Sequence, residues 1–150
     1  MQISSLGCSG GIGGNLRTTA MLLDSDVLVD AGTGVGDLTI TELLKIDHVL
    51  LTHSHLDHIT SLPLLVDTVG PMRGMPVTVH CTEATRKILQ EHIFNWKVWP
   101  DFTEIPSKAS PCLQYSTFST GDTVDIGGRK VVVLPANHVV PAVGFQFDSG

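Results

Sequence analysis

The sequence predicts a layered α+β or α/β domain that contains two β-sheets or one large mixed sheet. Short apolar runs bounded by Gly, Asp and Pro lie near both ends of the chain and are typical of strands. Between them lie segments in which apolar residues recur with helical spacing. The chain has 150 residues, 42% of them hydrophobic, which is enough for a core, so we expect one domain over residues 1–150.

The first strands are predicted on either side of a Gly-rich loop. QISSL has the composition of a strand, and the stretch GCSGGIGG that follows is a loop because its glycines favour no regular element. Two further apolar runs are joined at Asp24-Ser25-Asp26, which is a hairpin signal. A fourth run, DHVLLT, is apolar and bounded by polar residues, as in a buried strand. These predicted strands cover residues 2–6, 18–24, 26–32 and 47–52.

Helices are predicted between the strands. One opens near Asp57, and Pro63 falls within its first turns, where a missing N–H does least harm. Another begins near Thr82 or Glu83, both of which suit a helix start. The predicted helices cover residues 35–45, 57–70 and 82–96. The later strands cover residues 75–80, 112–120, 122–128, 129–136 and 142–150, and a Pro-containing loop covers 97–112.

Charge, cysteine content and the absence of long apolar runs limit the partners and the cellular compartment that we expect. The net charge is −6 with nine Lys and Arg in total, which disfavours long nucleic acid but not a small phosphate ester held by a metal. Cys8, Cys81 and Cys112 cannot all pair, which favours reduced thiols. The N-terminus lacks signal-peptide features and no apolar run approaches ~20 residues, so we expect a cytoplasmic protein without a membrane partner. The sequence does not decide the oligomeric state, and a homo-oligomer is among the alternatives.

Three histidines and an aspartate lie close together in the segment LLTHSHLDHIT. His53 and His55 are two residues apart on an extended segment, so their imidazoles point to one side and can converge on one zinc or iron ion. Asp57 and His58 follow as the chain turns into a helix, and they can face a second ion a few ångströms away. The spacing therefore predicts two metal ions.

A first ion held by only two histidines would lack ligands, because such sites usually take three or four protein ligands. His138 lies just past an apolar strand, as His53 does, and the ends of neighbouring strands can share one site. A lone histidine of this kind is more often a surface residue. Given the first cluster, we expect His138 to be the third ligand.

Several segments carry a resemblance to a known superfamily. HSHLDH resembles the HxHxDH signature of metallo-β-lactamase-fold hydrolases, LVDAGTG at 28–34 resembles their earlier aspartate motif, and ANHVVP resembles their isolated later histidine. Within the superfamily, HLDHITSLPLLVD, EHIFNWKVWPDFT and the opening LGCSGG…NLRTTAMLL are most similar to class II 3′,5′-cyclic-nucleotide phosphodiesterases. Ser61 stands where many relatives have glycine, which weakens a likeness to the tRNA-processing nucleases more than one to the phosphodiesterases.

The resemblance implies a four-layer αββα sandwich, of which this chain covers the N-terminal part. Asp30 would orient an imidazole, whereas taken alone it fits a turn residue at the end of its strand. A bridging aspartate and a last histidine, which relatives also supply, would lie beyond Gly150. The ligands suit two divalent ions, zinc above all, with iron or manganese as alternatives. The implied ligands are His53, His55 and His138 for the first ion, and Asp57 and His58 for the second.

The resemblance implies hydrolysis of a phosphodiester, with a 3′,5′-cyclic nucleotide as the small-molecule substrate. Two divalent ions would lower the pKa of a shared water, and the resulting hydroxide would attack phosphorus. Asp57 would be the catalytic carboxylate, orienting the water or moving a proton. His92 and Asn95, beside aromatic residues, are candidates for binding the base, although those aromatic side chains fit a core at least equally well.

Other functions use the same residues. Another hydrolase of the same fold, acting on an ester, a thioester, a lactam or an RNA phosphodiester, would use the same ligands, because a fold does not fix a substrate. A non-catalytic binding protein with an incomplete metal site is an alternative from another class. A metal content of about two ions per chain would favour catalysis. Turnover of cyclic AMP compared with a thioester would then separate the hydrolases.

Overall fold

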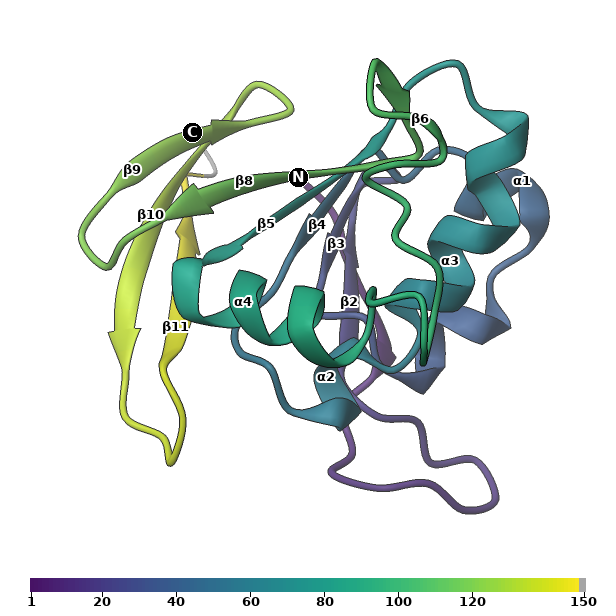
Figure 1. Ribbon diagram of the computed structural model, residues 1–150. Helices are drawn as coiled ribbons and strands as arrows, with labels where there is room; N and C mark the ends of the chain where they lie inside the picture. The colour runs from purple at the N-terminus through teal and green to yellow at the C-terminus, as the bar shows by residue number, and fades with distance from the viewer. Residues whose placement is uncertain (149–150) are drawn as a thin grey trace.

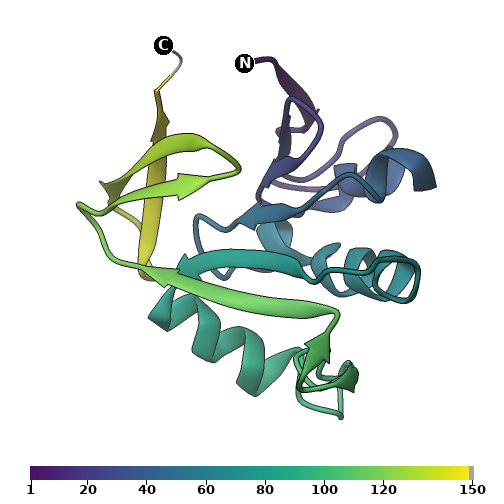
Figure 2. The same ribbon diagram turned by 90° about the horizontal axis from the view of Figure 1, so that it is seen from above.

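Helices cover one face of a six-stranded sheet, and a three-stranded sheet packs on its other face (Figures 1 and 2). The computed structural model describes residues 1–148. The large sheet consists, in spatial order, of β1 (Ile3–Gly7), β2 (Ala20–Leu23), β3 (Val27–Val29), β4 (His48–Leu50), β5 (Val77–Thr82) and β8 (Leu113–Phe118). Strands β1 to β3 pair antiparallel, and β3, β4, β5 and β8 pair parallel.

The small sheet is antiparallel and has the order β11-β10-β9. Its strands are β9 (Thr123–Ile126), β10 (Arg129–Ala136) and β11 (Ala142–Phe147), and a further two-stranded ribbon joins β6 (Pro106–Ser107) to β7 (Ser110–Pro111). The α-helices are α1 (Ile40–Leu43), α2 (Leu56–Ile59), α3 (Leu62–Val69) and α4 (Glu83–His92), with 3₁₀ turns η1 (Thr33–Asp37) and η2 (Gly70–Met72). Within residues 1–148, none of the helices has the length and apolarity needed to span a bilayer.

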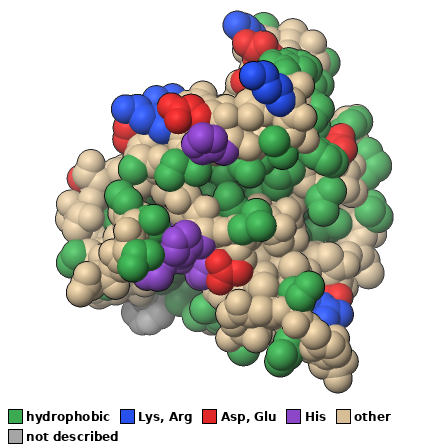
Figure 3. Space-filling view, turned by 60° about the horizontal axis from the view of Figure 1, so that its bottom comes forward, with side chains coloured by type: hydrophobic (Ala, Val, Ile, Leu, Met, Phe, Trp, Pro, Cys, Tyr) green, Lys and Arg blue, Asp and Glu red, His purple; other side chains and the backbone are tan. Residues whose placement is uncertain are grey.

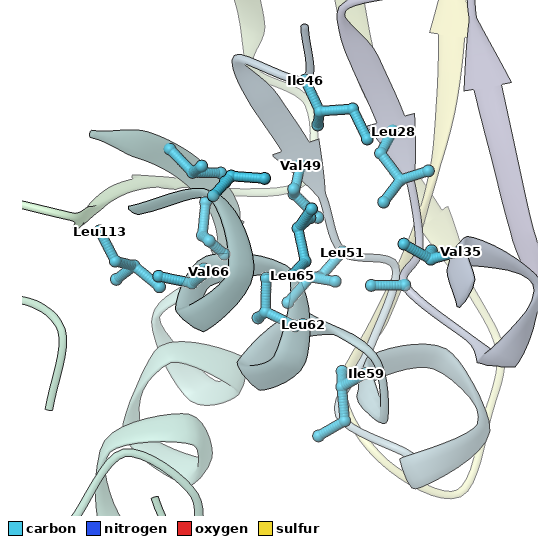
Figure 4. Packing of buried hydrophobic residues seen from close by; sticks show 14 of the residues in the cluster. Leu28, Val35, Ile46, Val49, Leu51, Ile59, Leu62, Leu65, Val66 and Leu113 are labelled. Atoms are coloured by element: carbon cyan, nitrogen blue, oxygen red, sulfur yellow. The ribbon is translucent and has the colours of Figure 1, made fainter. Parts of the chain in front are cut away.

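Side chains of the large sheet alternate between two cores, because successive residues of a strand point to opposite faces. On β3, Leu28 lies in the core under the helices, whereas Val27 and Val29 pack toward the small sheet. On β4, Val49 and Leu50 divide in the same way. Figure 4 shows the helix-side core, in which leucines of α3 face side chains from β3 and β4. Each of these strands is therefore apolar on both faces, which explains its continuous apolar sequence.

The small sheet supplies the second core and is tied to the large one at its edge. Ile126 and Val131 are buried against the same cluster as Val27. The Arg129 guanidinium, at the start of β10, donates to the carboxylates of Asp24 and Asp26 at distances of 2.8 to 3.2 Å. Because those aspartates belong to the β2–β3 hairpin, this contact fixes where the small sheet sits over the large one.

The predicted strands are confirmed, with small shifts of their ends. The hairpin at Asp24-Ser25-Asp26 joins β2 to β3 as expected, and Asp24 has a φ of +47° there. The last strand, predicted over 142–150, is β11, and its positions 149 and 150 lie outside the described residues. Helices, one large sheet and one smaller sheet are three of the four layers that the resemblance implies.

The predicted helix over 57–70 is wrong as a single element, because the structure has two helices there, α2 and α3. Pro63 lies in the first turn of α3. Its nitrogen carries no hydrogen and cannot donate to the carbonyl of Ile59, so a continuous helix would lose a hydrogen bond at this point. The chain instead breaks at Thr60 and Ser61 and restarts, and Pro63 occupies a helix start, where it is tolerated.

The predicted helix over 35–45 is likewise shorter than expected. It consists of the 3₁₀ turn η1 followed by α1, which spans only four residues. Thr39 separates them, because its side chain accepts from the backbone N–H of Glu42 while the Glu42 carboxylate accepts from the N–H of Thr39. Such a capping box marks a helix start, so a new helix begins after Thr39.

The helix predicted over 82–96 starts at the expected place and ends early. Thr82 caps α4 by accepting from the backbone N–H of Thr85, and the helix ends at His92. Phe94 then turns into the core and is only 2% exposed, whereas Trp96 is 59% exposed. The core interpretation of these aromatics thus holds for Phe94. The loop predicted over 97–112 is largely irregular and contains the short β6–β7 ribbon.

Candidate metal centre

The candidate residues meet at one edge of the large sheet. Strands β3 and β4 are parallel neighbours, so their carboxyl ends lie at the same edge. Asp30 directly follows β3, and the segment 52–58 follows β4. The turn between β10 and β11 reaches this edge too, because Val143 donates its backbone N–H to the carbonyl of Thr52 at 3.0 Å. His138 lies in that turn and is thereby brought to the same place.

The imidazoles of His53, His55 and His138 lie together. Their ligand nitrogens are all within 4.8 Å of one another. The ring centroids are 4.8 Å apart for His53 and His55, 4.6 Å for His53 and His138, and 4.8 Å for His55 and His138. The fold therefore brings together two histidines from the loop after β4 and one from the turn between β10 and β11 of the small sheet, although 83 positions separate His55 from His138.

The donor set and its spacing fit a divalent cation. The Nε2 of His138 and the Nδ1 of His55 are 3.1 Å apart. In a tetrahedral zinc site with Zn–N bonds of about 2.0–2.1 Å, two ligand nitrogens lie about 3.4 Å apart. A cation can therefore take the place between these two nitrogens with little movement of either ring.

Asp57 and His58 lie beside the three histidines. The His58 ring centroid is 4.1 Å from that of His53, and the Asp57 Oδ2 is 3.5 Å from the Nε2 of His58. The His58 side chain is 18% exposed and the Asp57 side chain is 34% exposed, so Asp57 is the more open of the two. One carboxylate oxygen and one imidazole nitrogen thus lie next to the cluster formed by the three histidines.

Asp30 is buried and holds His58 in place. It is 1% exposed and has a φ of +57°, a left-handed conformation that aspartate tolerates better than most residues. Its Oδ2 is 2.7 Å from the Nδ1 of His58. Its Oδ1 accepts from the backbone N–H of Thr52 at 2.8 Å. The sequence expectation that Asp30 orients an imidazole thus has a specific partner, His58.

The histidines differ in their affinity for a proton. Burial, together with the nearby His58, lowers the pKa of His53 to about 4. The hydrogen bond from His58 to Asp30 raises the pKa of His58 and outweighs the opposing effect of its burial. His53 is therefore neutral at pH 7, which is the state that binds a metal ion, whereas Asp30 favours the protonated form of His58.

These residues line an open cleft with a volume of about 350 Å³. Figure 3 shows histidine side chains gathered at the surface, with an acidic side chain beside them. Thr52 and Asn137 also line the cleft, and the sequence analysis did not single them out. The full lining is Thr52, His53, His55, Asp57, His58, Ala136, Asn137, His138, Ala142 and Val143.

His92 and Asn95 are not brought to this cleft. The His92 side chain is 68% exposed and lies 3.8 Å from the carboxylate of Glu91. The Asn95 side chain folds back on the local chain, where its Oδ1 accepts from the backbone N–H groups of Lys97 and Val98. In this geometry Asn95 stabilises a turn after α4.

Comparison with known proteins gives a family and a fold. The family model of the beta-lactamase superfamily domain matches residues 25–150. The chain is 19% identical to the metallo-beta-lactamase fold protein YhfI from Bacillus subtilis, with a TM-score of 0.72 over 97% of this chain and 58% of that one. It is 16% identical to unliganded yeast PDE1, with a TM-score of 0.70 over 97% of this chain and 59% of the other.

Two of the curated relatives that match this chain carry different names. The chain is 30% identical to "Ribonuclease Z" of Clostridium beijerinckii, over 98% of this chain and 49% of the relative. It is 27% identical to a "Probable 3′,5′-cyclic-nucleotide phosphodiesterase" of Yersinia pestis, over 72% of this chain and 38% of the relative. The chain therefore spans about half or less of the length of the curated relatives it matches.

Proposed function

The chain belongs to the beta-lactamase superfamily, and from this membership we propose that its histidine cleft is the metal centre of a phosphoric diester hydrolase. The observation that carries the proposal is the convergence of His53, His55 and His138 from two different sheets. In the proposal these three histidines hold one divalent ion, and Asp57 and His58 contribute to a second. Zinc is the first candidate, because neutral imidazoles with one carboxylate suit it, and iron or manganese are the alternatives.

The residues of the cleft divide the work between them. Divalent ions bound there would lower the pKa of a water and neutralise charge that develops on the phosphoryl oxygens. The three histidines offer imidazole nitrogens as ligands, and Asp30 fixes the orientation of His58. Asp57 is the acidic residue among those that line the cleft, and its partial exposure allows it to orient a water or accept a proton.

The proposed substrate is a 3′,5′-cyclic nucleotide. The Yersinia relative carries that name, and the sequence likeness over 55–67 and 91–103 supports the same class. The net charge of −6 favours a small phosphodiester over a long polyanion. A cleft open on one side also suits a small substrate approached from solvent.

RNA is the second candidate substrate, and the relatives named ribonuclease Z support it. They match this chain over up to 98% of its length, more than the Yersinia relative does. RNA binding would need a basic surface, because contacts to phosphates supply most of the affinity for nucleic acid.

Metal content tests the proposed centre. We expect purified protein to bind zinc, and His138→Ala to lose affinity for the first ion by at least about tenfold, because one of three imidazoles is removed. His92→Ala is the matched control, since His92 is exposed and lies outside the cleft. An unchanged zinc affinity of His138→Ala would contradict the proposed centre.

Substrate turnover tests the proposed reaction. Cyclic AMP, bis(p-nitrophenyl) phosphate, a structured RNA and a thioester are offered to the metal-loaded protein under the same conditions. Hydrolysis of cyclic AMP above the other three supports the cyclic nucleotide, and faster cleavage of RNA assigns the second candidate. Turnover of the thioester alone, or of none of the four, would overturn a phosphodiesterase.

A further inference from the structure

We propose that the hydroxyl of Thr52 connects the carboxylate of Asp30 to His53 by hydrogen bonds, so that one buried carboxylate orients two imidazoles. We call the chain of hydrogen bonds from Asp30 through Thr52 to His53 the relay. The Thr52 Oγ1 lies 2.8 Å from the Oδ2 of Asp30 and 2.9 Å from the Nδ1 of His53. The same Oδ2 lies 2.7 Å from the Nδ1 of His58. That the Nε2 atoms of these two rings bind metal rests on the proposed function, whereas the hydrogen bonds at the Nδ1 atoms do not.

The direction of the hydrogen bonds follows from the chemistry of the groups. A carboxylate offers only acceptors, so the Thr52 hydroxyl and the Nδ1 of His58 must both donate to Asp30. The single hydroxyl hydrogen is then used, and the Thr52 oxygen can only accept from the Nδ1–H of His53. His53 and His58 therefore both carry hydrogen on Nδ1, and in the neutral ring of His53 this leaves Nε2 with a free lone pair.

The relay assigns a tautomer to His53 that the imidazole alone would not fix. A neutral imidazole can carry its hydrogen on either nitrogen, and the hydrogen bond made by one nitrogen decides which. With hydrogen on Nδ1, the Nε2 of His53 can bind a cation. With hydrogen on Nε2, the ring would present an N–H there and repel one.

The backbone holds the Thr52 hydroxyl in place from two sides. The Thr52 N–H donates to the Oδ1 of Asp30 at 2.8 Å, and the Thr52 carbonyl accepts from the N–H of Val143 at 3.0 Å. A β-branched side chain also has few χ1 rotamers, so the hydroxyl has little freedom. Thr52 is therefore a positioning residue, which connects Asp30 at the end of β3 with His53 after β4 and with the small sheet.

The choice of variants isolates the hydroxyl. Thr52→Val keeps the shape of the side chain and removes the relay. Thr52→Ser keeps the hydroxyl and removes only a methyl group. Thr68→Val is the matched control, because Thr68 is exposed on α3 and lies outside the cleft.

The test reads the tautomer of His53 by long-range ¹H–¹⁵N NMR of the full protein, freed of metal by a chelator, at neutral pH. We expect hydrogen on Nδ1 of His53 in the unmodified protein, in Thr52→Ser and in Thr68→Val, and a population with hydrogen on Nε2 in Thr52→Val. Zinc affinity should fall about 10- to 100-fold in Thr52→Val and recover in Thr52→Ser, as for other residues that orient metal ligands.

Hydrogen on Nε2 of His53 in the unmodified protein would overturn the relay without any variant. So would an unchanged His53 tautomer in Thr52→Val, or a failure of Thr52→Ser to recover the zinc affinity. If Thr52→Val does not fold, the His53 tautomer of the unmodified protein and the zinc affinity of Thr52→Ser still test the relay. Because the tautomer is read without metal or substrate, an inactive protein with the expected tautomer refutes the proposed function and leaves the relay intact.

Discussion

At the scale of single residues, the candidate centre depends on a close approach between two loops at Gly32. A Cβ added to Gly32 would lie 2.5 Å from the Thr18 Oγ1 and 2.6 Å from the carbonyl oxygen of Asp57. The hydrogen bond from the N–H of Ala31 to the carbonyl of His58, at 2.6 Å, joins the same two loops. Glycine is thus required here by space, since its φ of −74° suits any residue.

Gly32→Ala should push the segment 28–34 away from the ligand loop. We expect a loss of about 1–3 kcal/mol in the free energy of unfolding, as for other overpacked sites, together with weaker zinc binding. Urea unfolding and a zinc titration measure the two effects. Gly36→Ala is the control, because a methyl group added there would meet no atom within 4 Å, and it should be neutral or slightly stabilising. Equal stability of the two variants would contradict the argument.

A second histidine pair lies between the sheets, away from the cleft. The Nδ1 of His48 and the Nε2 of His80 are 3.1 Å apart, and His80 is only 6% exposed. Burial, and to a lesser degree the charge of His48, lowers the pKa of His80 to about 4. Since an unfolded histidine titrates near 6.5, the unfolded chain binds a proton between about pH 6.5 and 4 that the folded protein does not.

Stability should therefore fall as pH falls through this window, and the share due to His80 should be about 1–3 kcal/mol. His53, whose pKa is also lowered to about 4, adds a loss of the same sign in metal-free protein. His80→Gln keeps a hydrogen-bonding group beside His48 but cannot titrate, so its stability should depend less on pH. Urea unfolding at pH 7, 6, 5 and 4 measures both proteins, and parallel pH profiles would contradict this role of His80.

Sequence alone identifies residues whose pattern is local, and it misses those whose partners depend on the fold. His53, His55, Asp57 and His58 stand out because they are close together in the chain, and the structure keeps them together, although their role as ligands stays a prediction. Thr52 carries no signal in the sequence, because its contact with Asp30 exists only once β3 and β4 pair in parallel.

At the scale of elements, strands are predicted well and helices less so, for physical reasons. The central strands of the large sheet are apolar runs with both faces buried, a signal that survives without knowledge of their partners. Helical spacing does not show where a helix breaks. Pro63 and the Thr39 capping box each restart a helix, and both are start signals that a longer periodic pattern obscured.

The small sheet is held at the start of β10 by Arg129. Its guanidinium contacts two carboxylates, and its side chain is only 20% exposed. Arg129→Met should destabilise the protein by about 1–3 kcal/mol, because two partly buried carboxylates lose charged donors. Lys108→Met removes the exposed ion pair with Glu104 and should leave the stability almost unchanged, because exposed ion pairs contribute little. Urea unfolding of both variants decides, and equal values would mean that Arg129 does not join the sheets.

At the scale of the whole molecule, the order of strands could not be derived from residue patterns. Apolar runs do not show that β8 lies beside β5 or that β9 to β11 form a separate sheet. The resemblance supplied the layered architecture, and the hydrophobic pattern supplied the strands that fill it. The position of His138 combines both levels, since a histidine after a strand becomes significant only when that strand belongs to the sheet facing β4.

The candidate centre joins the two sheets, so a bound cation should stabilise the whole molecule. His53 and His55 follow β4 of the large sheet, and His138 lies in the β10–β11 turn of the small one. A ligand that binds only the folded state adds about 2.7 kcal/mol at a concentration of 100 Kd. For a chain of this size, that corresponds to a rise in Tm of roughly 5–10 °C.

Zinc should accordingly raise the Tm of the metal-free protein and slow amide hydrogen exchange in β10 and β11, because opening the small sheet would break the site. Differential scanning calorimetry and exchange measured by mass spectrometry report the two effects. His92→Ala should respond as the unmodified protein does, whereas His138→Ala should show a smaller rise in Tm and no slower exchange in β10 and β11, since the remaining histidines of the cleft all belong to the large sheet. If zinc stabilises His138→Ala fully, the cation does not connect the sheets, and the β10–β11 turn only lies near the site.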